Sequence, residues 1–276
     1  MRNNQRRFKQ TPSAAGAVES VASTMDFLSP TEFVELPSRG LFYPEDHPLH
    51  QQETVEIRFM TAKDEDILSS TALLKKGLAI DRLLTNLLVL DMDPRSLLLG
   101  DRNAVLIAAR KSGYGSEYKF SIKCDSCAAN NDIVYDLSEG EITGNCFDEK
   151  FLRKNNITHN AGTGTLDLVL PTSGVEVGVA FVDGHGEKQL LAEHGTENSV
   201  VTSVLASFIV KVNDDEDFNY VTNFIDSMPA KDSKFIRTLY PKLVPNIVLN
   251  HEFTCAACWS KNDVEVPLRA AFFWPE

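Results

Sequence analysis

The sequence predicts an α+β fold with a helical core, short antiparallel strands and a four-cysteine element made from two distant Cys-x-x-Cys pairs. Three observations predict it. Apolar residues recur at helical spacing in several stretches, other short stretches alternate as strands do, and the cysteine pairs lie between predicted strands. With 276 residues, of which 43% are hydrophobic, the chain can form one large domain or two modest ones around a buried core.

The chain is acidic, since 27 Lys and Arg against 39 Asp and Glu give a net charge of −12. This balance argues against a nucleic-acid-binding protein, which must neutralise phosphates, and against docking on anionic lipid. No apolar run is long enough to span a bilayer, and the charged N-terminus lacks the apolar stretch of a signal peptide. We therefore expect a soluble protein that stays in a cytoplasm.

Residues 1–30 are predicted to form a flexible N-terminal tail. Basic residues without any acid mark its first ten positions: Arg2, Arg6, Arg7 and Lys9. Small residues then follow from 13 to 24. We favour a disordered leader, which could order on a partner, over a nucleic-acid-binding arm, because one short basic run is a weak signal.

One strand and three helices are predicted next: strand 54–59 and helices 61–77, 80–88 and 101–113. The strand is indicated by alternation, and the second helix by an apolar stripe with spacing i, i+3, i+4, i+7 and i+8. Thr61 can cap the first helix, whose first turn holds acids, and Gly77 ends it. Asp101 can cap the third helix, and Gly113 suits its C-terminal end.

The rest of the chain alternates between strands and helices. We predict strands 118–122 and 133–137, a hairpin of 166–170 and 175–181, helices 188–212, 218–228 and 232–243, and strands 247–253 and 264–268. Residues 138–160 are acidic and polar and are predicted to be irregular. Gly195 could break the first of these helices. The predicted divisions are the tail 1–30, a helical part 31–137 with the first cysteine pair, an inserted hairpin and helical segment 138–245, and a C-terminal part 246–276 with the second pair.

The two cysteine segments repeat each other. Residues 124–137 align without gaps on residues 255–268, so that both cysteines, Asn131 with Asn262, Asp132 with Asp263 and Leu137 with Leu268 match. Each segment is predicted as strand, tight turn, polar loop and strand, which is how a zinc knuckle is built. Two knuckles supply a tetrahedral shell of four thiolates. The predicted ligands of one Zn²⁺, in a zinc-ribbon-like element, are Cys124, Cys127, Cys255 and Cys258.

Four thiolates close the shell and leave no place for water, so the predicted metal is structural and not catalytic. Replacing Cys124 or Cys258 with serine is expected to unfold the core. Unmetallated thiols and a thioredoxin-like redox pair are the alternatives, although a redox Cys-x-x-Cys begins a helix. Ala128 and Trp259 follow the knuckles where glycine, which permits a positive φ, is common.

Sequence motifs of the common enzyme classes are absent: there is no P-loop, no His-Glu-x-x-His and no Gly-x-Ser-x-Gly. The six histidines are scattered, and His251, just before the second knuckle, could replace or support a ligand but is favoured as a surface residue. Cys146 is interpreted as a free thiol. No catalytic residue is predicted, and we expect a protein that is not an enzyme.

Two aromatic clusters, Phe42-Tyr43 and Phe272-Phe273-Trp274, could anchor an interface or pack on the core. The acidic run 213–217 is predicted to be a solvated loop that starts a helix, because it lacks the glycine and distal glutamate of a calcium-binding loop.

Several short motifs, taken in order, are similar to those of the T4-type bacteriophage baseplate protein family. The N-terminal ones are Leu36-Pro-Ser-Arg-Gly40, Tyr43-Pro44, Val55-Glu-Ile-Arg58 and Thr61-Ala-Lys-Asp-Glu65. The block before the first cysteine pair contains Leu97-Leu-Leu99, Asp101-Arg102, Ala109-Arg110, Gly113-Tyr114-Gly115 and Tyr118. The C-terminal ones are the second cysteine pair, Val264-Glu-Val-Pro267 and Phe272-Phe273-Trp274-Pro275. The resemblance covers about residues 33–276.

The resemblance implies a baseplate hub protein of contractile-tailed phages, or a chaperone-like factor that helps hub proteins assemble. It implies other baseplate hub proteins as partners, no catalytic residues, and a location in the host cell cytoplasm during assembly or in the virion tail baseplate. The alternative is a zinc-ribbon nucleic-acid-binding module or an uncharacterised enzyme. Lys123, Lys261 and Trp259 near the knuckles are offset by the acids Asp125, Asp132, Asp136, Asp263 and Glu265, which favours protein partners.

Overall fold

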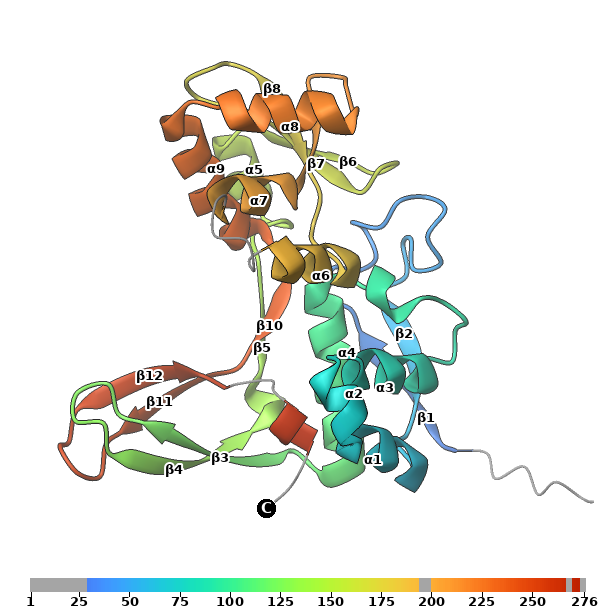
Figure 1. Ribbon diagram of the computed structural model, residues 1–276, viewed down its shortest axis with the longest axis vertical. Helices are drawn as coiled ribbons and strands as arrows, with labels where there is room; N and C mark the ends of the chain where they lie inside the picture. The colour runs from blue at the N-terminus through green and yellow to red at the C-terminus, as the bar shows by residue number, and fades with distance from the viewer. Residues whose placement is uncertain (1–28, 194–199, 267–269, 274–276) are drawn as a thin grey trace, which may run out of the picture.

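A computed structural model describes residues 29–193, 200–266 and 270–273. Most of the predicted N-terminal tail, Gly195, Leu268 and Trp274 lie outside the described residues. Figure 1 shows a body in two parts, stacked along the long axis, and an arm that extends sideways from the lower part. Helices and short antiparallel strands are both present, which confirms the predicted α+β class.

The lower part of the body packs four helices against a two-stranded antiparallel sheet (Figure 1). The sheet pairs β1 (Thr31–Glu35) with β2 (Thr54–Arg58), and the helices are α1 (Ala62–Ser69), α2 (Thr71–Lys75), α3 (Ala79–Leu87) and α4 (Leu99–Tyr114). The apolar stripe predicted for 80–88 is real: Leu83, Leu84 and Leu87 are fully buried in α3. Helix α4 packs against both α3 and β1, and Ala104, Val105 and Ala109 on it are buried.

The upper part is a four-stranded antiparallel sheet covered by helices (Figure 1). The strand order is β6 (Ile157–Asn160), β7 (Thr165–Val169), β8 (Glu176–Val179) and β9 (Ile209–Val212). The helices are α5 (Glu149–Lys154), α6 (Gly184–Glu193), α7 (Val200–Ala206), α8 (Phe218–Ser227) and α9 (Ala230–Leu243). Buried residues of both parts form one continuous apolar core.

Two hairpins form the arm, and a short strand pair links the upper part to the region where the arm begins. The link pairs β5 (Glu141–Thr143) with β10 (Asn246–Val248). The arm hairpins are β3 (Glu117–Lys123) with β4 (Asn130–Asp136), and β11 (Asn250–Thr254) with β12 (Lys261–Glu265). The arm has a small apolar cluster of its own around the cysteine turns, whereas Tyr118 of β3 and Tyr135 of β4 belong to the main core. The predicted helices within 62–112 and 188–243 do not pack near the cysteine turns, because the arm carries these turns away from both helical groups (Figure 1).

The structure corrects several predicted elements. The region 138–160 is not irregular, because it contains β5, α5 and β6. The helix predicted over 188–212 ends earlier, and Ile209–Val212 instead pairs with β8 as strand β9. The helix predicted over 61–77 is divided at Ser70, whose extended backbone ends α1 and caps α2. Helix α4 continues past Gly113 to Tyr114, and Gly115 provides the left-handed C-cap with φ 83°.

Asp101 does not cap a helix, because α4 begins two residues before it. Its buried carboxylate accepts hydrogen bonds from the Ser38 backbone N–H at 2.9 Å, the Ser38 hydroxyl at 2.6 Å and the Tyr43 hydroxyl at 2.7 Å. Burial raises the pKa of this carboxyl, and these donors oppose the shift. Phe42 and Tyr43 are therefore core residues, which excludes them as exposed anchors.

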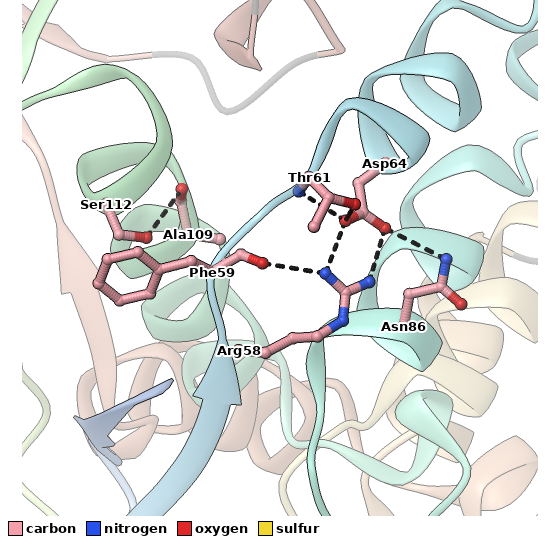
Figure 2. Close-up of polar contacts among 7 residues, drawn as sticks. All are labelled: Arg58, Phe59, Thr61, Asp64, Asn86, Ala109 and Ser112. Carbon is pink, nitrogen blue, oxygen red and sulfur yellow. Dashed lines mark hydrogen bonds and ion pairs between the residues drawn. The ribbon is translucent and has the colours of Figure 1, made fainter. Parts of the chain in front are cut away.

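A second polar cluster joins β2 to the start of α1 (Figure 2). The Arg58 guanidinium donates two hydrogen bonds to the Asp64 carboxylate, at 2.7 and 2.8 Å. Asp64 also accepts from the Thr61 backbone N–H at 2.9 Å, the Thr61 hydroxyl at 2.8 Å and the Asn86 amide at 3.2 Å. Burial raises the pKa of the Asp64 carboxyl, but these donors outweigh it and lower the pKa from 3.8 to about 2.

Asp64 should therefore make the free energy of unfolding depend on pH in the acid range. A carboxyl whose pKa is lower in the folded state stabilises the fold above its ordinary pKa of 3.8, and this contribution is lost as the pH falls towards about 2. Asp64→Asn should lose less stability than the wild type over this pH range. Urea denaturation at a series of acid pH values measures the difference, and parallel pH profiles would contradict the assignment.

A third cluster attaches the C-terminal segment to α4. The buried Arg110 guanidinium donates to the backbone carbonyls of Phe272 at 2.9 Å, Gly115 at 2.9 Å and Glu117 at 3.3 Å. The 3-10 helix Ala270–Phe273 thereby docks on the lower part, and Phe272 and Phe273 are both 1% exposed. These two rings are core residues and not interface anchors.

Candidate metal centre

The two cysteine turns meet because their hairpins have the same register. In the first hairpin Ile122 lies opposite Asn131, and in the second Phe253 lies opposite Asn262. Each pair occupies the same position relative to its Cys-x-x-Cys turn, as the sequence repeat predicted. The turns lie together at the far end of the arm (Figure 1). Both lie between strands, and neither begins a helix, as a thioredoxin-like redox pair would.

Each turn is closed by the same two backbone hydrogen bonds. Cys124 N–H donates to Ala129 O at 2.9 Å, and Ala128 N–H donates to Cys124 O at 2.8 Å. The second turn has its own pair, Cys255 N–H to Ser260 O at 2.9 Å and Trp259 N–H to Cys255 O at 2.9 Å. Ala128 and Trp259 adopt left-handed backbone, with φ 57° and 60°. The knuckle conformation therefore forms without the glycine that is common there.

The four sulfurs converge from both hairpins. Cys124 Sγ lies 3.7 Å from Cys258 Sγ, Cys127 Sγ lies 3.7 Å from Cys255 Sγ, and all four lie within 4.8 Å of one another. These separations are too long for a disulfide, whose sulfurs lie about 2.0 Å apart. A tetrahedral Zn²⁺ with Zn–S bonds of about 2.3 Å would hold its sulfurs about 3.8 Å apart. The donor set and its spacing therefore fit a tetrahedral ion.

Two buried asparagines connect the turns reciprocally. Asn131 donates to Ala129 O of its own turn at 3.0 Å and accepts from the Ala256 N–H of the other turn at 3.1 Å. Asn262 donates to Ser260 O at 3.0 Å and accepts from the Asp125 N–H at 3.3 Å. The Asn131 amide also donates to Cys255 Sγ at 3.6 Å. We call these two side chains the asparagine clasp.

Donors around the sulfurs favour thiolates in part of the cluster. The Ser260 hydroxyl, 3.3 Å from Cys124 Sγ, lowers the pKa of that thiol to about 5, with help from the N–H groups of Cys127 and Ser126. The pKa of Cys255 is lowered by the N–H groups of Cys258 and Ala257.

Without a cation, the hydrogen-bond donors around the sulfurs do not favour the thiolate form of all four cysteines, and Cys127 is the exception. The Ala129 N–H lowers the pKa of the Cys127 thiol, but the neighbouring thiols of Cys258, Cys255 and Cys124 outweigh it and raise the pKa to about 12. Four thiolates this close repel one another, so full deprotonation needs a cation among them.

Other predicted residues lie apart from this cluster. Among the described residues, the group of four cysteines is the one cluster of histidine, cysteine and acidic side chains that could hold a metal ion. Cys146 is buried in the main core, which raises the pKa of its thiol to about 12. His251 packs edge-on against the Tyr135 ring, with centroids 5.7 Å apart, and is not part of the cluster. The asparagine clasp and Ser260 were not predicted as functional, although the Asn131–Asn262 match signalled the clasp.

The family comparison agrees with the order of the motifs. A family model described as T4 bacteriophage base plate protein matches residues 32–274. The chain belongs to this family. The comparisons found no curated protein and no solved structure that matches this chain. Within the described ranges, every helix is too short or too polar to cross a bilayer.

In this base plate protein, motif residues hold the fold together. Asp101 and Ser38 form one buried cluster, Arg58 and Asp64 a second, and Arg110 donates to a backbone carbonyl of the C-terminal motif. Through Asp101 and Arg110, these motifs connect α4 to the N-terminal and C-terminal segments. Through Arg58 and Asp64, they connect β2 to α1.

Proposed function

We propose that this base plate family member is a hub protein or a hub assembly factor that acts through protein–protein contacts. The observation that carries the proposal is the convergence of four cysteines from segments more than a hundred residues apart, which fixes a projecting arm. A fixed arm is suited to bind partners. The proposal assigns the protein no catalytic residues.

The proposed metal is one structural Zn²⁺ bound by Cys124, Cys127, Cys255 and Cys258. Four soft sulfur ligands at tetrahedral spacing favour zinc over magnesium or calcium, which bind oxygen. When bound, the ion supplies charge neutralisation and a crosslink. Structural zinc sites contribute on the order of 10 kcal/mol of folding free energy in small peptides, which is enough to hold two short hairpins together.

The asparagine clasp should raise the affinity of this site for zinc. Asn131 donates to Cys255 Sγ and orients the opposite turn, so Asn131→Ala is expected to lower zinc affinity by about tenfold, as loss of hydrogen bonds to metal ligands commonly does. Competition against a chromophoric chelator measures the affinity. Asn130→Ala, which changes an exposed neighbour, is the matched control. Equal affinities for the two variants would contradict the assignment.

Trp259 is the proposed contact residue at the tip of the arm. Its side chain is 79% exposed, although tryptophan is usually largely buried. It also occupies left-handed backbone, which costs a residue with a Cβ about 1 kcal/mol. A large exposed aromatic kept at a strained position indicates a role outside folding, and tryptophan is enriched among residues that dominate protein interfaces.

Trp259→Gly separates folding from binding. Glycine relieves the left-handed strain, so thermal stability should stay equal or rise, while binding to baseplate partners should be lost. Co-purification from infected cells measures binding. Ala128→Gly gives the same backbone relief in the other knuckle without removing a ring and should keep its partners. Loss of binding in both variants, or in neither, would contradict the assignment.

The charges of the arm support protein partners over nucleic acid. Asp125, Asp132, Asp263 and Glu265 surround the knuckles, and they would repel a phosphate backbone. The proposed partners are other baseplate hub proteins, and the proposed locations are the host cytoplasm during assembly or the virion tail. Comparing finished particles with assembly intermediates, by co-purification, tests both. Salt-sensitive, tight binding to DNA or RNA would overturn this function.

A further inference from the structure

A basic groove lies between α5 and α9 of this acidic chain. It has a volume of about 450 Å³, and the half-buried rings of Phe151 and Phe235 line it. Four exposed lysines surround these rings: Lys154, Lys231, Lys234 and Lys242. In the described part of the chain, none of the four makes an ion pair.

Acids on the same two helices are already engaged. Asp148 caps α5, and Glu149 pairs with Arg153 at 2.7 Å. The buried Asp232 carboxylate accepts from the backbone N–H groups of Thr172 at 2.8 Å and Ser173 at 2.9 Å. The groove therefore keeps a local excess of positive charge around an apolar floor, on a chain whose net charge is −12.

A segment of opposite charge occurs on the same chain, in the turn before α8. Asp215 and Asp217 fix this turn, because Asp215 accepts from the Asp217 N–H at 2.8 Å and Asp217 caps α8 at 2.9 Å. Asp214 and Glu216 are both exposed. Asp214 interacts electrostatically with Lys211, whose ion-pair partner is Asp167 at 3.0 Å. Phe218 follows the acids of this turn and is 69% exposed. We call residues 214–218 the acidic turn.

We propose that the acidic turn of one copy docks into the basic groove of a second copy. The carboxylates would meet the lysines, and Phe218 would lie on the apolar floor. Within one described copy, no ion pair joins these carboxylates to these lysines. Helix α8, about 15 Å long, lies between the turn and the start of α9. Net repulsion between two acidic copies favours the one orientation in which opposite charges meet.

This contact is head-to-tail, because it joins two different surfaces, so in a pair of copies one keeps an unused groove and the other an unused turn. It is independent of the zinc site and of Trp259. A nucleic-acid strand would also meet four lysines, but the apolar floor and the overall negative charge favour an acidic protein segment that carries an aromatic ring.

Sedimentation equilibrium of the full chain tests the proposal. The average mass of the wild type should rise with concentration at low salt, and added salt should suppress the rise. Lys231→Glu with Lys234→Glu should give a monomer. Glutamate near the start of α9 is compatible with the helix dipole, so the fold should survive. Lys75→Glu with Lys76→Glu changes charge equally outside the groove and should still associate.

A mixture of the turn variant and the groove variant gives the most specific test of the proposed contact. Asp214→Ser with Glu216→Ser, a turn without charge, should also be monomeric alone, yet an equimolar mixture with the groove variant should form a 1:1 dimer that grows no further. That mixture keeps one intact turn and one intact groove. A monomeric wild type at all concentrations, a monomeric mixture, equal loss in the Lys75 and Lys76 control, or binding of a single-stranded oligonucleotide in place of self-association would overturn the proposal.

Discussion

Changing Cys124 and Cys258 together to serine is expected to abolish binding of the proposed zinc and unfold the arm. Hydroxyls are poor ligands for zinc, and the two remaining thiolates do not close a tetrahedral shell. Sequence alone predicted that the main core would unfold. The structure narrows this expectation, because the buried cysteines of the site, Cys124 and Cys255, belong to a small apolar cluster distinct from the main core. We now expect amide exchange to rise sharply in β3, β4, β11 and β12 while α3 and α4 stay protected.

Hydrogen exchange with mass spectrometry, together with elemental analysis, measures both effects. Cys146→Ala is the matched control, because Cys146 is buried in the main core and lies outside the sulfur cluster. The control should keep a full complement of zinc. An arm that stays protected in the double serine variant would show that the strands hold it without the metal.

Replacing Arg110 with methionine should produce the largest loss of stability outside the arm, about 3 kcal/mol. Methionine fills a similar length but leaves three carbonyls, those of Phe272, Gly115 and Glu117, without their charged donor. Burial lowers the pKa of the guanidinium, yet arginine stays protonated in proteins, so the native contacts are charge-assisted. Urea denaturation measures the loss.

Arg95→Met is the control for Arg110. Arg95 pairs with Asp93 at the surface, with both side chains over a third exposed, and such pairs contribute little. The control should denature at the wild-type midpoint. Equal midpoints for Arg110→Met and Arg95→Met would mean that the C-terminal 3-10 helix is held by its buried rings and not by the guanidinium.

The sequence predicted the structure correctly where the residues that determine an element lie close together in the chain. The apolar stripe of α3 depends on residues within three turns, and it was predicted as found. The cysteine repeat was informative for the same reason, because a tight turn and a fixed offset place Asn131 and Asn262 equivalently in two hairpins. Both knuckles could thus be recognised without knowing how the rest of the chain folds.

The sequence predicted the structure wrongly where a residue or strand interacts with a partner that is distant in the chain. Asp101 has the residue type and position of a cap, and nothing nearby reveals that Ser38 and Tyr43 occupy its oxygens. Residues 209–212, Ile-Val-Lys-Val, are too few for their periodicity to distinguish helix from strand, and pairing with β8 makes them a strand. Whether a hairpin packs on the main core or extends as part of the arm depends on contacts with residues far away in the sequence. No local sequence pattern predicts those contacts.

X-ray absorption at the zinc edge, combined with the metal content of the purified full-length protein, tests the central claim most directly. The account predicts one zinc per chain with four sulfur neighbours at about 2.3 Å and no oxygen or nitrogen ligand. Well-folded protein that contains no metal, or an ion bound by fewer than four sulfurs, would contradict it.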